Sequence, residues 1–103
     1  MSEAERVLQA LGDPTRRAIF DRLAQGPASI SQLAEPLGVT VTAVAQHIAV
    51  LEAAGLARSH KLGRVRTCAL ATEGLDVLAQ WIRAKRPPLE RALDRLGDML
   101  DED

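Results

Sequence analysis

The sequence predicts a mainly helical domain with one small β-hairpin and a long terminal helix. Three observations predict this class. Residues 31–54 hold two helical segments that are separated by a tight turn at Gly38. Residues 56–70 hold two short β-like runs on either side of Leu62-Gly63. Residues 73–100 repeat apolar residues at helical spacing. A chain of 103 residues has the length of one domain with a single core, so we expect residues 1–103 to form one unit.

The second helix of the pair, residues 40–55, has a buried face and a smooth exposed face. Thr40 suits the N-cap, and Gly55 suits the left-handed position after the last turn. The face expected in the core carries Val41, Val44, Ile48 and Leu51. The opposite face carries Thr42, Gln46, Ala49 and Ala53, without an acid. An Ala-rich packing helix is one interpretation of this pattern, and a helix that approaches another surface closely is the other.

The exposed face fits the major groove of B-DNA, which is wide enough to admit a helix. Gln46 is the best candidate for base recognition, because an amide can bond both N6 and N7 of adenine. The residues of this segment that we predict to contact DNA are Thr40, Thr42, Ala43, Gln46 and His47. His47 lies toward the edge of the buried face, so local packing is the alternative for it.

Capping signals mark three earlier helices. The pairs are Ser2 with Glu5, Asp13 with Pro14, and Ser29 with Gln32. They predict helices over residues 3–11, 15–25 and 31–37, and Pro36 should shorten or kink the last of these. A short helix, a tight turn and a second capped helix form the helix-turn-helix pattern.

The hairpin that follows is basic. Its predicted strands are residues 56–60 and 65–70, and no acid occurs between Glu52 and Glu73. Its basic residues are Arg58, Lys61, Arg64 and Arg66. A basic hairpin directly after a helix-turn-helix is the wing of a winged-helix domain, and its charges can neutralise DNA phosphates. A solvated edge strand protected by Lys and Arg is the alternative.

The terminal segment predicts a helix with an unpartnered apolar side. Thr72 is expected to cap it, and Pro87-Pro88 to break or kink it. Four leucines then recur at steps of four, three and four residues: Leu89, Leu93, Leu96 and Leu100. This spacing favours pairing with a second copy, and folding back onto the chain's own core is the alternative. The last three residues, 101–103, are expected to be frayed.

Composition excludes several classes of function. The net charge of -1 favours no partner by itself. Cys68 is the one cysteine, so no intramolecular disulfide forms, which fits the cytoplasm. No signal peptide or membrane-length apolar run is visible. Phe20 and Trp81 are the only aromatic residues, which disfavours single-strand binding by base stacking. No nucleophile-base pair or phosphate loop points to an enzyme.

Four segments together resemble the ArsR-type (ArsR/SmtB-like) winged-helix transcriptional regulators. They are GDPTRRAIFDRLAQGP (12–27), SISQLAEPLGV (29–39), AVAQHIAVLEAAGLARSHKLGR (43–64) and RTCAL (66–70). The resemblance implies a cytoplasmic homodimeric repressor that binds a palindromic operator in double-stranded DNA. It also implies a dimer interface built from the first and last helices, here residues 3–11 and 73–100. The interface residues predicted on this basis are Val7, Leu8, Leu11, Leu89, Leu93, Leu96 and Leu100.

The resemblance is to the subgroup without metal sites. Metal-sensing members carry a Cys motif near the position of Ser31, or His, Asp and Glu sets on the last helix. Here Cys68, His47 and His60 are isolated in sequence and fit no ligand spacing. We therefore predict no metal site and no cofactor, and the sequence identifies no small-molecule effector. A redox role for Cys68 remains a minor alternative.

Two departures from the family concern the exposed helix. Relatives often have Ser where this chain has Ala45, and Lys where it has Ala49. The expected DNA contacts therefore shift to Thr42, Gln46 and the wing. The alternative function is a protein-interaction module, in which the terminal apolar helix recruits another protein and DNA binding is vestigial.

Overall fold

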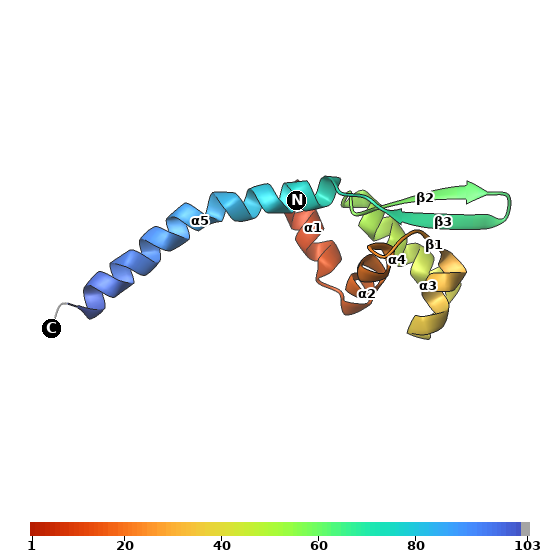
Figure 1. Cartoon of the computed structure of the whole chain (residues 1–103), viewed down its shortest axis with the longest axis horizontal. Helices are drawn as coiled ribbons and strands as arrows, with labels where there is room; N and C mark the ends of the chain where they lie inside the picture. Colours follow the sequence, from red (N-terminus) through yellow and green to blue (C-terminus); the bar gives the residue numbers. More distant parts are fainter. Residues whose placement is uncertain (102–103) are drawn as a thin grey trace.

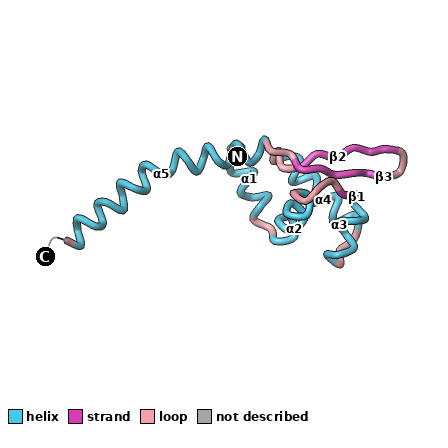
Figure 2. The backbone as a smooth tube through the Cα atoms, in the orientation of Figure 1, coloured by secondary structure: helices cyan, strands magenta, loops and turns pink. Residues whose placement is uncertain are grey.

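The fold gathers four helices and a small sheet around one core, and a fifth helix runs away from it (Figure 1). The computed structural model describes residues 1–101. The elements in this range are α1 (Glu3–Leu11), α2 (Pro14–Leu23), β1 (Ala28–Ser29), α3 (Ile30–Leu37), α4 (Val41–Ala53), β2 (Ala57–Leu62), β3 (Val65–Leu70) and α5 (Glu73–Leu100). The backbone tube shows the β2–β3 hairpin projecting at the opposite end from α5 (Figure 2). Residues 102 and 103, part of the predicted frayed tail, lie outside the described residues.

Short-range capping bonds set the starts of α1 to α4, as predicted. Thr40 Oγ1 accepts a hydrogen bond from the N–H of Ala43 at 3.0 Å, at the start of α4. Ser29 and Gln32 make both bonds of a capping box at the start of α3. Gly38 ends α3 with φ of 64°, a left-handed conformation that favours glycine. The turn into α4 is therefore fixed by residues close in sequence.

The inner face of α4 anchors the core. Val44, Ile48 and Leu51 are at most 1% exposed, as predicted. The prediction for Val41 is wrong, because this side chain is 51% exposed. Val41 is the first residue of α4, and it lies beside the hairpin rather than over the core.

The sheet has three strands in the order β1-β3-β2, all antiparallel. The sequence predicted the hairpin but missed β1, which pairs Ala28 with Cys68 and Ser29 with Thr67. A two-residue strand carries no alternating pattern, so it becomes visible only with its partner in place. Because β1 runs directly into α3, this pairing fixes the start of α3 against the base of the hairpin.

Helix α5 is continuous over 28 residues, so the predicted break at Pro87-Pro88 is wrong. Each proline lacks an N–H and crowds the carbonyl four residues earlier. The surrounding residues 80–96 are all exposed, so solvent can hydrate the carbonyls that lose their partner. Figure 1 shows that α5 is bowed along its length. Thr72 occupies the N-cap position of α5, but its side chain makes no capping hydrogen bond.

The C-terminal part of α5, residues 84–100, forms an arm. The part before it packs on α1 and the core through Leu75, Val77 and Leu78. The arm extends away from the body, and the molecule measures 69 × 25 × 25 Å. Its four seam leucines, Leu89, Leu93, Leu96 and Leu100, are 51–70% exposed. Folding back onto the chain's own core is therefore wrong as an interpretation of this segment.

No single helix within residues 1–101 is long and apolar enough to cross a membrane. By length and composition alone α3 and α4 together pass as a broken span, bent by 112°. Their apolar faces belong to the core described above.

Candidate nucleic-acid interface

The outer face of α4 is exposed and free of acids over residues 41–51. Thr42, Gln46 and Ala49 lie on it at helical spacing, and all three are exposed. Short neutral side chains let a helix axis approach a flat or grooved surface closely, and Gln46 is the longest polar side chain available there. Thr40 is also exposed, but its hydroxyl already accepts the capping bond at the helix start.

A hollow of about 240 Å³ lies between α3, α4 and the hairpin. Its helical side is lined by Ser29, Ile30, Ser31 and Val41, and its hairpin side by Arg64, Val65 and Arg66. The hairpin therefore lies against the starts of both helices. Free amides and the positive end of the helix dipole gather at such starts, and these favour anions such as phosphate. Ser31 and Val41 are not among the predicted DNA-contacting residues, although both lie in the first turn of a helix that faces this hollow.

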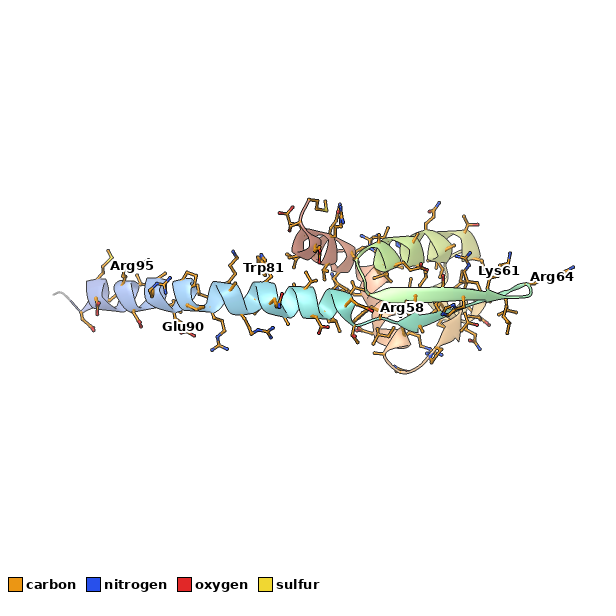
Figure 3. The ribbon with its side chains drawn as sticks, turned by 90° about the horizontal axis from the view of Figure 1, so that it is seen from above. Arg58, Lys61, Arg64, Trp81, Glu90 and Arg95 are labelled. Atoms are coloured by element: carbon orange, nitrogen blue, oxygen red, sulfur yellow. The ribbon has the colours of Figure 1, made fainter. Side chains whose placement is uncertain are left out.

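The distal hairpin carries the free positive charge. Lys61, Arg64 and Arg66 are exposed, and none has an ion-pair partner within residues 1–101. Figure 3 shows Lys61 and Arg64 toward the tip and Arg58 at the base. Cations held beside a groove-binding helix match phosphates that flank the groove.

Arg58 differs from the other three basic residues. Its guanidinium forms an ion pair with Glu73, the first residue of α5. The pKa of Glu73 is held below its ordinary value by its own backbone N–H and by the charge of Arg58. Glu73 is therefore ionised at neutral pH, and the charge of Arg58 is already compensated. This pairing argues against the predicted phosphate contact of Arg58.

His47 faces α2 rather than the outer surface. Its Nδ1 lies 3.3 Å from Nη1 of Arg16, whose Nε donates to the carbonyl of Ala10 at 2.7 Å. Arg17 donates to the carbonyl of Leu11 at 2.6 Å. The two arginines thus bind carbonyls at the end of α1, and His47 connects α4 to this cluster. Local bonding, the alternative for His47, describes its position better than DNA contact does.

Cys68 lies in β3 with its side chain fully buried. Burial raises the pKa of its thiol, and the nearby charge of Glu52 raises it further, against a smaller opposite effect of Arg66. A protonated, buried thiol is a poor nucleophile and a poor metal ligand.

We expect a thiol reagent such as dithionitrobenzoate to modify native Cys68 at least about 100-fold more slowly than the unfolded chain at pH 8, because the thiol must be exposed before it reacts. The release of thionitrobenzoate with and without denaturant measures both rates. A native rate equal to the unfolded one would restore the redox interpretation.

The predicted interface residues of α1 divide into buried and exposed positions. Val7 is 1% exposed and belongs to its own protomer's core, so it offers no surface to a second copy. Leu8 is 43% exposed and Leu11 is half-buried. Of the predicted interface residues, Leu8 and the four leucines of the arm therefore have exposed side chains. Within residues 1–101 no three His, Cys, Asp or Glu side chains gather as a metal site would require.

A short helix, a tight turn, an exposed second helix and a basic hairpin define the class of winged helix-turn-helix DNA-binding proteins. Comparison with known proteins agrees with this class. A family model described as "Helix-turn-helix domain" matches residues 11–60. The HTH-type transcriptional regulator Rv2034 of Mycobacterium tuberculosis is 42% identical over 85 residues, which cover 78% of this chain and 79% of the relative. The transcriptional repressor SdpR of Bacillus subtilis is 29% identical over 76 residues, 74% of this chain and 84% of the relative.

Solved structures extend the match to the whole fold. The crystal structure of an ArsR family transcriptional regulator, RHA00566, is 41% identical, with a TM-score of 0.80 over 85% of this chain and 91% of that one. An ArsR-like transcriptional regulator from Rhodococcus sp. RHA1 is 30% identical, with a TM-score of 0.81 over 98% and 93% of the two chains. A winged helix-turn-helix domain of Mycobacterium bovis, Mb0332, described as homodimeric, shares the fold at 22% identity and a TM-score of 0.64, over 90% and 83%.

The chain belongs to the ArsR family of winged helix-turn-helix transcriptional regulators. It is a DNA-binding regulator and not an enzyme.

Proposed function

We propose that this chain is a homodimeric, cytoplasmic repressor that binds a palindromic operator in double-stranded DNA. The observation that carries the proposal is the joint surface of α4 and the hairpin. Thr42 and Gln46 are exposed on an acid-free face, and the starts of α3 and α4 share a hollow with Arg64 and Arg66. Residues 42–49 would enter the major groove while Lys61, Arg64 and Arg66 contact phosphates.

Repression and dimerisation have separate support. The similar protein SdpR is a transcriptional repressor, which favours repression over activation. The exposed leucines of the arm supply an apolar seam, and two-fold pairing would place two α4 helices about one DNA turn (~34 Å) or a small multiple apart. The proposal includes no metal response, because His47 is bound to Arg16 and the Cys68 thiol is buried and protonated.

The test is a fluorescence-anisotropy titration with duplex DNA from upstream of the protein's own gene. A random duplex serves as competitor, at two or more salt concentrations. Tight binding that falls steeply with salt and resists the competitor supports the proposal. Equal, weak binding to both duplexes argues against a specific operator in that region.

Arg64→Ala should weaken binding to every sequence, because a wing cation is lost without a change in base contacts. The salt slope, which is the slope of log K against log salt concentration, should fall by about one phosphate contact per protomer.

Gln46→Ala should instead relax discrimination at one or two base pairs by about 1–3 kcal/mol. The same titrations on operator and random DNA measure both effects. If Gln46→Ala loses equal affinity for both duplexes, Gln46 does not recognise bases.

A protein-interaction module remains the alternative function, favoured by the exposed arm. Light scattering of the isolated protein separates the two functions, since a monomer with an unpaired arm would point to a different protein partner.

A further inference from the structure

Residues 53–72 contain no acidic residue. The two acids that border this segment, Glu52 and Glu73, both contact the hairpin. Glu73 forms its ion pair with Arg58. Glu52 Oε1 accepts a hydrogen bond from Ser59 Oγ at 2.5 Å. Arg58 and Ser59 are consecutive residues near the start of β2. The two acids that border a basic segment therefore both bind its base.

The two bonds hold β2 from two different helices. Consecutive strand residues point to opposite faces. Glu52 lies in the last turn of α4, and Glu73 is the first residue of α5. The base of the hairpin is thus connected on one face to α4, the helix proposed to enter the major groove, and on the other to α5, the helix that carries the arm.

Beyond its base, the hairpin borders the helices only at the hollow where Arg64, Val65 and Arg66 face the starts of α3 and α4. Residues 60–67 are all exposed. Strand β1 pairs with β3 at its inner end, whereas β2 is an edge strand of the described sheet. The direction in which Lys61 and Arg64 project is therefore set mainly at the base, where Figure 3 shows Arg58.

We propose that Glu52 and Glu73 are positioning residues that hold the wing against α4 and α5 for its contacts with phosphate. The inference rests on the proposed contacts of the wing with DNA. It makes a prediction opposite in sign to that of simple electrostatics. Removing a carboxylate beside a DNA-binding surface should strengthen binding through charge alone, whereas loosening the wing should weaken it.

The experiment compares Glu73→Gln with Asp76→Asn by anisotropy titration on the same operator duplex. Asp76 is an exposed acid one turn along α5, and its side chain makes no hydrogen bond or ion pair within residues 1–101. Positioning predicts that Glu73→Gln binds about two- to five-fold more weakly, the size of effect of one exposed ion pair, and that Asp76→Asn binds equally or more tightly. Glu73→Gln that binds more tightly than the wild type would overturn the inference.

Conservative and compensating variants separate positioning from a general loss of structure. Glu52→Gln keeps a hydrogen-bond acceptor for Ser59 and loses a negative charge, so it should bind as tightly as the wild type or more tightly. Glu52→Ala loses the acceptor as well and should bind more weakly than Glu52→Gln. Arg58→Glu combined with Glu73→Arg restores an ion pair and should recover most of the affinity that Arg58→Glu alone loses. No recovery in the double variant would count against positioning.

Amide hydrogen exchange of the free protein, measured by mass spectrometry, provides a readout that needs no DNA. Positioning predicts faster exchange over residues 57–70 in Glu73→Gln than in Asp76→Asn, with unchanged exchange in α1 and α2. Identical exchange in the two variants would overturn the inference, whatever the DNA result. If Arg64→Ala leaves the salt slope unchanged, the proposed wing contacts fail instead, and the exchange result still decides whether the two acids hold the wing.

Discussion

Leu93→Glu combined with Leu96→Glu is expected to give a folded monomer that has lost tight binding to a palindromic operator. Both side chains are more than half exposed on the arm, and a two-fold dimer would bury four of them. At about 1.5 kcal/mol or more for each buried leucine, the loss is about 6 kcal/mol, or about 10⁴-fold in the dimer dissociation constant. Light scattering measures the mass, and circular dichroism verifies that the helices remain.

The matched control adds the same two charges to the other side of α5. Gln80→Glu with Ala84→Glu lies opposite the leucine seam at 100° per residue, and both positions are exposed. This variant should keep the mass and the operator affinity of the wild type. A Leu93→Glu, Leu96→Glu variant that remains dimeric would show that the seam is not the interface.

Gly74→Ala is expected to lower the free energy of unfolding by about 2 kcal/mol and the melting temperature by about 10 °C. A Cβ atom at Gly74 would lie 2.3 Å from the carbonyl oxygen of Ala54 and 2.9 Å from Cδ2 of Leu56. The backbone N–H of Gly74 also donates to the carbonyl of Gly55 at 2.8 Å, so the end of α4 and the start of α5 are in direct contact. The side chain would force these helices apart. Thermal unfolding followed by circular dichroism measures the change.

Gly97→Ala is the control within the same helix. A Cβ atom at Gly97 meets no atom within 4 Å. The substitution should therefore stabilise α5 by about 0.5–1 kcal/mol, the ordinary advantage of Ala over Gly in a helix. If Gly74→Ala stabilises the protein as Gly97→Ala does, the contact between α4 and α5 is looser than described.

Features determined by neighbouring residues could be predicted from the sequence. The Thr40 cap and the Ser29 capping box need partners three residues away, and both form. The inner face of α4 follows from helical spacing over a single segment, and the prediction fails only at Val41, where the helix begins and the core ends.

Features that depend on distant partners could not be predicted. Strand β1 is defined by its pairing with β3, about 40 residues later. The sequence does not reveal that Arg58 has an ion-pair partner, because Glu73 is 15 residues away and belongs to another element. The spacing of His47 fitted both DNA contact and local packing, and Arg16, 31 residues earlier, favours packing. The predicted break of α5 at Pro87-Pro88 is wrong because each proline removes only one backbone hydrogen bond near its own position. A long exposed helix stays continuous in spite of that loss.

The extended arm also determines how the protein diffuses. The radius of gyration is 18.6 Å, compared with about 13 Å for a compact chain of this length. A single protomer of this shape would move through a gel-filtration column as a larger compact protein does. Its elution volume would therefore suggest a dimer even for a monomer, so the state of assembly has to come from a measured mass. Small-angle X-ray scattering on the Leu93→Glu, Leu96→Glu monomer should show interatomic distances reaching about 69 Å, the longest dimension of one protomer.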